Sequence, residues 1–194
     1  MEHTFLLSDP KLDCLRAVLG RHALHMFTPT IHVSEHSTRA RDFSIALSSG
    51  FCVVESDWGD TKKEAIDYHV MHVSLADHPK NVPMIEELLG KDGKGQLVYR
   101  RGMPSCSSVH VGGAYATSTH LAEVVKIEVL EYQKRGIEDH VRYDHSILVT
   151  FDNARQFIFS PPQSMSILGG LEFTGDAATI EALIPKLTIR CTLE

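Results

Sequence analysis

The sequence lacks the features that would place the chain in a membrane or in an oxidising compartment. No stretch approaches the roughly 18 consecutive apolar residues that a membrane span needs. Residues 1–10 contain no basic segment followed by an apolar one, as a secretion signal would. The four cysteines are far apart and form no CxxC pair, so we expect reduced thiols rather than disulfides. These absences predict a soluble, cytoplasmic protein that makes no membrane contact.

The chain also lacks an excess of positive charge. It has 19 lysine and arginine residues against 25 aspartate and glutamate residues, which gives a net charge of −6. Duplex nucleic acid is recognised by clustered positive charge, so we do not expect a nucleic-acid partner. An acidic protein is instead steered toward a basic partner.

What the sequence does contain is an ordinary globular composition. Hydrophobic residues make up 43% and charged residues 23%, so the chain can bury enough apolar surface to fold without cross-links. No shift in composition marks a linker. Residues 1–194 are therefore predicted to form a single globular domain.

Three segments have helical signals. Asp9 suits the cap and Pro10 the first turn of a helix over residues 9–20. Its apolar face consists of leucines three and four residues apart: Leu12, Leu15 and Leu19. Shorter helices are predicted from Asn81 to Gly90 and after Asp176.

Most of the remaining chain alternates with the period of two that is typical of strands. The clearest case is a hairpin joined through Gly136, in which residues 125–129 pair with residues 143–151 and one face is exposed to solvent. A turn is predicted at Gly59 and Asp60, directly after the only tryptophan, Trp58, which we interpret as a packing residue.

The last strand is predicted to place four residues on one apolar face: Leu187, Ile189, Cys191 and Leu193. In total the patterns indicate about eight to ten strands and about three short helices. Strands that follow one another through short loops favour antiparallel pairing. The prediction is a strand-rich α+β fold of mainly antiparallel sheet with the helices packed against it.

Twelve histidines in 194 residues are the one unusual feature of the composition. Histidine binds metals and transfers protons near neutral pH, so this excess suggests a metal or catalytic site, and the spacing between the histidines shows whether they could share one. His69 and His72 are three residues apart, which on a strand places them on opposite faces. No HExxH or CxxC pattern accompanies them. We expect no cofactor, and a metal site built from distant strands stays open.

Two H-x-S patterns form a more specific constellation: His32 with Ser34, and His72 with Ser74. Within each pattern the two side chains point the same way on a strand. Two such strands side by side would allow one histidine to act as base, the other as acid, and the hydroxyls to hold phosphate oxygens. The paired motifs resemble those of the two-histidine phosphoesterases, which implies phosphodiester hydrolysis.

Three functional hypotheses follow. The first is a non-catalytic domain of the inhibitor or immunity type that binds another protein through a sheet edge or loops, because the sequence has no cofactor, metal or nucleophile motif. The second is a phosphodiesterase that uses His32, Ser34, His72 and Ser74. The third is a metal- or small-molecule-binding domain that uses the histidines. The sequence leaves open whether the chain is an enzyme.

Overall fold

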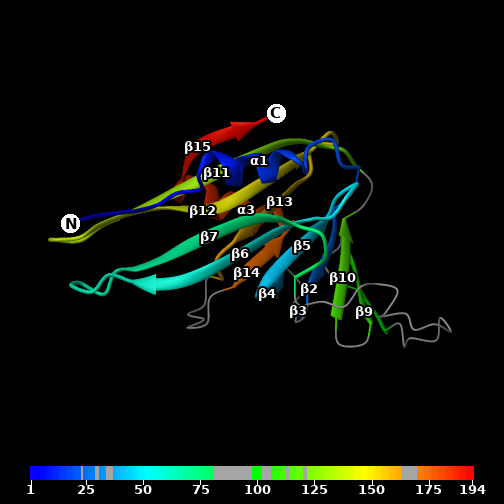
Figure 1. Cartoon of the computed structure of the whole chain (residues 1–194), viewed down its shortest axis with the longest axis horizontal. Helices are drawn as coiled ribbons and strands as arrows, with labels where there is room; N and C mark the ends of the chain where they lie inside the picture. The colour runs from blue at the N-terminus through cyan, green and yellow to red at the C-terminus, as the bar shows by residue number, and fades with distance from the viewer. Residues whose placement is uncertain are drawn as a thin grey trace.

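Strands dominate the fold. The computed structural model describes residues 1–22, 24–28, 31–33, 37–80, 98–101, 106–111, 114–119, 122–162 and 170–194. Two sheets face each other, and the long hairpins β6–β7 and β11–β12 extend together toward one end of the molecule (Figure 1).

The first sheet has eight strands, and seven of them form a continuous path. In spatial order these are β15 (Thr188–Leu193), β11 (Val124–Arg135), β12 (His140–Phe151), β13 (Gln156–Ser160), β14 (Leu171–Thr174), β4 (Thr38–Ala40) and β3 (Ile31–Val33). Every neighbouring pair on this path is antiparallel. The eighth strand, β1 (Glu2–Phe5), pairs in parallel with β12.

The second sheet has seven strands, all antiparallel to their neighbours. In spatial order these are β7 (Asp67–Ala76), β6 (Phe51–Asp60), β5 (Asp42–Ala46), β2 (His25–Thr28), β10 (Ala114–Thr119), β9 (Cys106–Val111) and β8 (Val98–Arg101). The two sheets together confirm the predicted strand-rich α+β class with antiparallel pairing.

Two α-helices occur in the described part of the chain, α1 (Asp9–Arg16) and α3 (Ala177–Leu183), and a 3₁₀ turn (Ile184–Lys186) follows α3. The cap of α3 is formed as predicted, because Oδ2 of Asp176 accepts a hydrogen bond of 2.9 Å from the Thr179 amide. The predicted helix at 81–90 lies outside the described residues. Neither described helix is long and apolar enough to cross a membrane.

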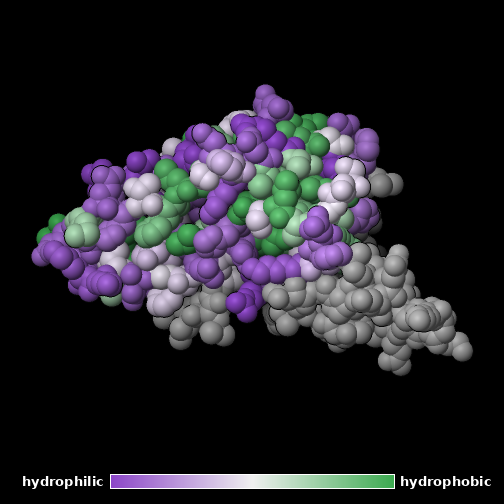
Figure 2. Space-filling view, viewed as in Figure 1, coloured by the Kyte–Doolittle hydropathy of each residue, from purple (hydrophilic) through white to green (hydrophobic). Residues whose placement is uncertain are grey.

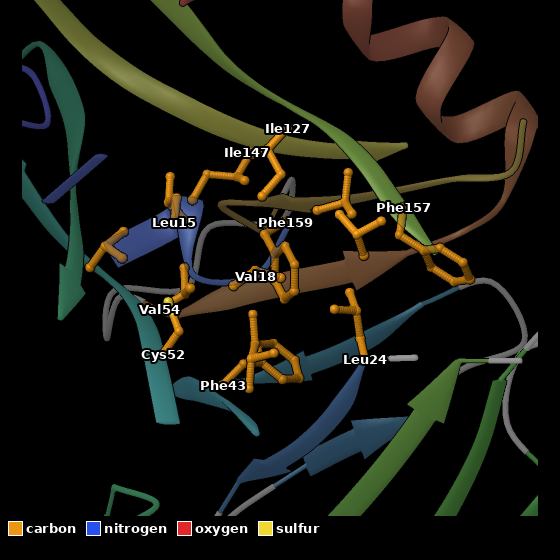
Figure 3. Close-up of a cluster of buried hydrophobic side chains, with 14 of the residues drawn as sticks. Leu15, Val18, Leu24, Phe43, Cys52, Val54, Ile127, Ile147, Phe157 and Phe159 are labelled. Atoms are coloured by element: carbon orange, nitrogen blue, oxygen red, sulfur yellow. The ribbon is translucent and has the colours of Figure 1, made fainter. Parts of the chain in front are cut away.

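The main core fills the space between the two sheets, and α1 closes one side of it. The side chains that converge there come from both sheets and from α1 (Figure 3); they include Leu15, Val18, Leu24, Phe43, Cys52, Val54, Ile127, Ile147, Phe157 and Phe159. Phe43 of the second sheet contacts Phe159 of the first, with ring centroids 5.6 Å apart. We call this cluster the main core.

The β11–β12 hairpin was predicted to expose one face, and this is wrong over its central part. Ile180 and Leu183 of α3 pack on the outer face of the sheet in one cluster with Leu130, Leu148 and Ile158. Alternation shows that a strand has two different faces, but it does not show which later element covers the second one.

Two β-bulges turn predicted core residues outward. Val125 is an extra residue opposite β12, so Val124 occupies the buried position at 1% exposure and Val125 is 42% exposed. A second bulge in β15 leaves Ile189 54% exposed. A bulge inserts one residue and reverses the facing of the side chains beyond it, which a strict period of two does not anticipate.

The turn predicted at Gly59 and Asp60 is also wrong, because β6 continues through Asp60 and the chain turns at residues 61–66. Gly59 has a packing role instead. A Cβ atom at this position would lie 2.8 Å from the ring of Tyr68 on the neighbouring strand. The glycine therefore makes room for an aromatic ring.

Candidate functional site

The two H-x-S patterns lie in different sheets. His32 is in β3, at one margin of the eight-stranded sheet, where its position pairs with Arg39. His72 is in β7, at one margin of the seven-stranded sheet, opposite Glu55. Ser34 lies outside the described residues. The strands β3 and β7 are not neighbours, so the pairing that the phosphodiesterase hypothesis requires is not formed within a sheet.

The second H-x-S pattern faces solvent. Ser74 is exposed, and His72 has a 36% exposed side chain whose Nε2 lies 3.2 Å from Oδ2 of Asp57, itself 76% exposed. Ion pairs at such exposure contribute at most about 1 kcal/mol. Nothing described around these side chains encloses a substrate.

A different group of histidines is enclosed between β7 and the β11–β12 hairpin. We call it the histidine–tyrosine seam, and it consists of Tyr68, His69, Tyr132, Tyr143 and His145. The ring of Tyr143 lies at its centre, with its centroid 6.2 Å from that of His69 and 5.8 Å from that of His145. The Tyr132 ring lies 5.7 Å from Tyr143 and 5.8 Å from His145.

The alternation of the strands explains how these side chains meet. On β12, Tyr143 and His145 lie close to Ile147 of the main core, and His145 is the extra residue of a bulge opposite β11. On β7, His69 shares a face with Met71, which is 3% exposed in the same core. Because β7 packs against β12, the seam continues the inter-sheet layer from the main core to Ile66 and Val141, which are buried in one cluster with Tyr143.

The seam is uncharged at neutral pH. Burial, together with the nearby His69, lowers the pKa of His145 to about 4. Burial also lowers the pKa of His69, although the charge of Asp67 opposes this effect. Burial raises the pKa of Tyr143 well above its ordinary value, with further contributions from Tyr132 and Asp67. Each shift favours the neutral form of the ring, because a buried charge without a partner is costly.

Aromatic stacking extends the seam to the N-terminal strand. The ring of Phe5 in β1 stacks on that of Tyr68, with centroids 4.2 Å apart and planes 10° from parallel. The backbone of Gly59 also lies close to the Tyr68 ring. Tyr68 is thus held by contacts from β1 and β6 as well as by its own strand.

Polar contacts fasten the tips of the two hairpins at the end of the seam. The Glu64 carboxylate accepts hydrogen bonds from three successive amides, at 2.9, 3.0 and 2.7 Å: Ile137, Glu138 and Asp139. These bonds, led by that from Asp139, lower the pKa of Glu64. Nε2 of His3 lies 3.2 Å from Oδ1 of Asp139, which is 2% exposed.

A cavity of about 330 Å³ lies beside this fastening, and its lining includes His3, Thr61, Tyr68 and Asp139. His3 and Asp139 contact each other, and the amide of Ile66 donates to the Thr61 hydroxyl at 3.2 Å. The polar groups around the cavity therefore already bind parts of the fold, which indicates a structural role for them.

A separate polar cluster holds the margin of the eight-stranded sheet. Arg190 of β15 forms a two-point ion pair with Asp144 of β12, at 2.6 Å from Nε to Oδ1 and 2.7 Å from Nη2 to Oδ2. Asp144 is fully buried and also accepts a 2.6 Å hydrogen bond from the Leu7 amide. Two parallel charge-assisted bonds fix both position and orientation, so β15 is firmly attached to the sheet.

The histidine excess does not assemble a multidentate metal centre in the part of the chain that the structure describes. No group of three or more histidine, cysteine, aspartate or glutamate side chains there is arranged to hold a metal ion. His69 points into the seam, whereas His72 contacts Asp57. Their opposite facing follows from their three-residue spacing on a strand.

The sequence contained part of the signal for the seam. Alternation places His145 on an apolar face, which predicts a core or core-edge residue, and His69 on the face opposite to His72. What alternation does not supply is that β7 packs against β12. Residues that lie about seventy-five positions apart therefore meet without a shared motif.

Comparisons with protein-family models, curated proteins and solved structures find no match to this chain.

Proposed function

We propose that this chain is a protein-binding domain without catalytic activity, and that it binds an extended segment of its partner along the outer edge of β15. The observation that carries the proposal is that β15 is a firmly held edge strand whose outer side is paired with no other described strand. A strand at the margin of a sheet presents a row of free backbone donors and acceptors. A peptide in extended conformation can add to such a row as a further strand.

The edge of β15 is held in place before any partner arrives. The ion pair of Arg190 with buried Asp144 fixes the middle of the strand. Leu193 is 3% exposed in the main core, and Cys191 packs against that core. A pre-ordered strand loses little conformational entropy on binding, which favours affinity.

The same edge lacks most of the devices that discourage strand pairing. Residues 188–193 contain no proline and no lysine, and the single charge, on Arg190, is directed to Asp144. Ile189 adds a 54% exposed β-branched side chain to the edge. A bulge is present, and it is what brings Ile189 to the surface.

The strand β7, which is the longest strand at a sheet margin, is a weaker candidate. The helix α1 and the strands β1 and β12 all pack against it, so it already has partners from within the chain. The strand β15 is at a margin of the other sheet, and Figure 1 shows it near the C-terminus. We therefore assign binding to β15.

The visible surface also favours backbone pairing over an apolar contact. Figure 2 shows a largely hydrophilic face on which hydrophobic residues form separate groups rather than one continuous patch. A large continuous patch would have indicated docking of an apolar surface. The net charge of −6 favours a segment that carries basic residues.

The test uses a library of random ten-residue peptides displayed on phage and selected on the purified full chain. We expect enrichment of extended, β-branched peptides with lysine or arginine. Binding of a selected peptide, measured by calorimetry, should weaken at least tenfold in Ile189→Lys, because lysine on an edge strand opposes pairing.

The matched control is Ile137→Lys, which introduces the same side chain at a 98% exposed isoleucine in the β11–β12 turn. This variant should bind within twofold of the parent. Failure to enrich any peptide, or equal binding by both variants, would contradict the proposal. A parent chain that instead pairs with itself through β15 in sedimentation experiments would also contradict it.

A further inference from the structure

The histidine–tyrosine seam is a place where titratable rings from the two sheets meet. His69 belongs to the seven-stranded sheet and His145 to the eight-stranded sheet. Both imidazoles lie beside the single ring of Tyr143, at 6.2 and 5.8 Å between centroids. Any charge on either imidazole therefore arises at the contact between the sheets.

The hydrogen-bonding geometry opposes protonation of His69. Its Nδ1 atom is buried and has no hydrogen-bond partner among the described groups. A protonated imidazole carries N–H on both nitrogens, so the charged ring would have a buried donor with no acceptor. Leaving a buried donor unsatisfied destabilises the folded chain. In the neutral ring Nδ1 is an unpaired acceptor, whereas in the protonated ring it is an unpaired donor that also shares a buried positive charge, so protonation adds to the cost.

The groups around the two imidazoles provide little compensation for positive charge. Tyr68 comes from β7, Tyr132 from β11 and Tyr143 from β12, and His3 lies on the adjoining β1. All three tyrosines are neutral at ordinary pH. The carboxylate of Asp67 in β7 acts on His69 and partly favours its charged form.

Two further carboxylates near the seam are already neutralised by other groups. Asp144 follows Tyr143 and lies on the opposite face of β12, where Arg190 pairs with it. Asp139, near the hairpin tip, lies 3.6 Å from the N-terminal ammonium and 3.2 Å from Nε2 of His3. Among the described residues, the hydrogen bond of His145 is to a hydroxyl, with Nδ1 2.6 Å from Oγ of Ser146.

We propose that the seam is an acid-sensitive closure between the two sheets. At neutral pH the uncharged rings hold β7 against the β11–β12 hairpin. As the medium becomes acidic and the two imidazoles take up protons, these strands separate at the seam while the main core stays packed. This inference goes beyond the proposed peptide binding and does not depend on the edge of β15.

The chain contains its own reporter of this opening. Trp58, the only tryptophan, lies directly opposite His69 in the β6–β7 ladder. Residues opposite each other in a ladder have side chains on the same face and in contact range. We therefore expect the emission of Trp58 to change when His69 becomes charged. It should also change when β7 separates from β12.

The experiment follows Trp58 fluorescence of the full chain from pH 8 to pH 4, with methyl NMR signals of Ile127 and Ile147 as the record of the main core. We expect a reversible change in emission between about pH 6 and pH 4, below the ordinary histidine pKa. The two isoleucine signals should keep their folded positions through that change. Loss of all folded signals in the same step would show global unfolding and overturn the proposal.

Variants assign the transition to the seam. In His145→Phe the ring is retained without a titrating group, and the midpoint should fall by at least half a pH unit; the double variant with His69→Phe should show no transition in this range. The variant His145→Gln serves the same purpose if the phenylalanine is not accommodated. The control His25→Phe, at an exposed position in β2, should titrate like the parent. A transition unchanged by all seam variants would contradict the assignment.

Discussion

The main core and the histidine–tyrosine seam occupy the same layer between the two sheets, but they are built from different chemistry. The main core consists mainly of aliphatic and phenylalanine side chains, such as Phe43 and Ile147, which carry no titratable group. The seam consists of tyrosines and histidines around Tyr143. Aliphatic burial is insensitive to pH, whereas burial of imidazole stabilises the fold only while the ring is neutral. In this layer, the stability that comes from the main core does not depend on pH, whereas the stability that comes from the seam does.

The largest effect is expected from a cavity in the main core. Phe43 is fully buried, with ring centroids 5.6 Å from Phe159 and 6.0 Å from Phe173. Phe43→Ala should lower the free energy of unfolding by about 3–5 kcal/mol at every pH. Urea unfolding at two pH values measures this. If the loss in the free energy of unfolding differed strongly between pH 7.5 and pH 5, the contribution of the main core would also depend on pH. That result would contradict the distinction between the main core and the seam.

A smaller effect is expected where the seam meets β6. In Gly59→Ala the new Cβ would lie 2.8 Å from the Tyr68 ring, which stacks on Phe5. Displacing that ring should cost about 1–3 kcal/mol. The cost should largely disappear when Tyr68 is replaced by leucine in a double-mutant cycle. An undiminished cost in the double variant would show that the glycine serves the backbone rather than the ring.

The smallest effect is expected at the exposed histidine of the same strand. His72→Ala removes a side chain that is 36% exposed and that contacts only exposed Asp57 in the described structure. The free energy of unfolding should change by less than about 0.5 kcal/mol. Three positions away, His69→Ala should destabilise the chain clearly more. Equal effects of the two changes would remove the distinction between seam and surface histidines.

Local patterns predicted the elements that depend on local physics. Pro10 lies in the first turn of α1 as predicted, although Ser8 rather than Asp9 is the N-cap and the helix ends at Arg16. Asp176 caps α3 through the Thr179 amide. The β11–β12 hairpin follows from the alternation along most of its two strands, although bulges interrupt the pairing at two points. In these cases the interacting residues are close together in the sequence, so the local pattern is enough to predict the element.

Other features could not be predicted because their partners are distant. The strand β1 has only four residues, and its pairing partner β12 lies more than a hundred positions along the chain. Val125 and Ile189 have the right residue type for the core, but a bulge turns each of them outward. The seam itself requires that β7 face β12, which no spacing within either strand reveals.

The central claim is that the seam stabilises the fold only while it is uncharged. His145 has a folded pKa of about 4, below the ordinary value of about 6.5 expected in the unfolded chain. The unfolded state therefore binds more protons between these values. The contribution of His145 is complete above about pH 6.5 and is lost as the pH falls toward 4.

The most direct test is urea unfolding of the parent and of His145→Phe at pH 7.5 and pH 5.0, followed by Trp58 fluorescence. From the pKa of about 4 for His145, we predict that acidification costs the parent about 2 kcal/mol more than it costs the variant. An equal loss of stability in the two proteins would contradict a pH-dependent contribution from the seam. The seam and the main core would then not differ in their response to pH.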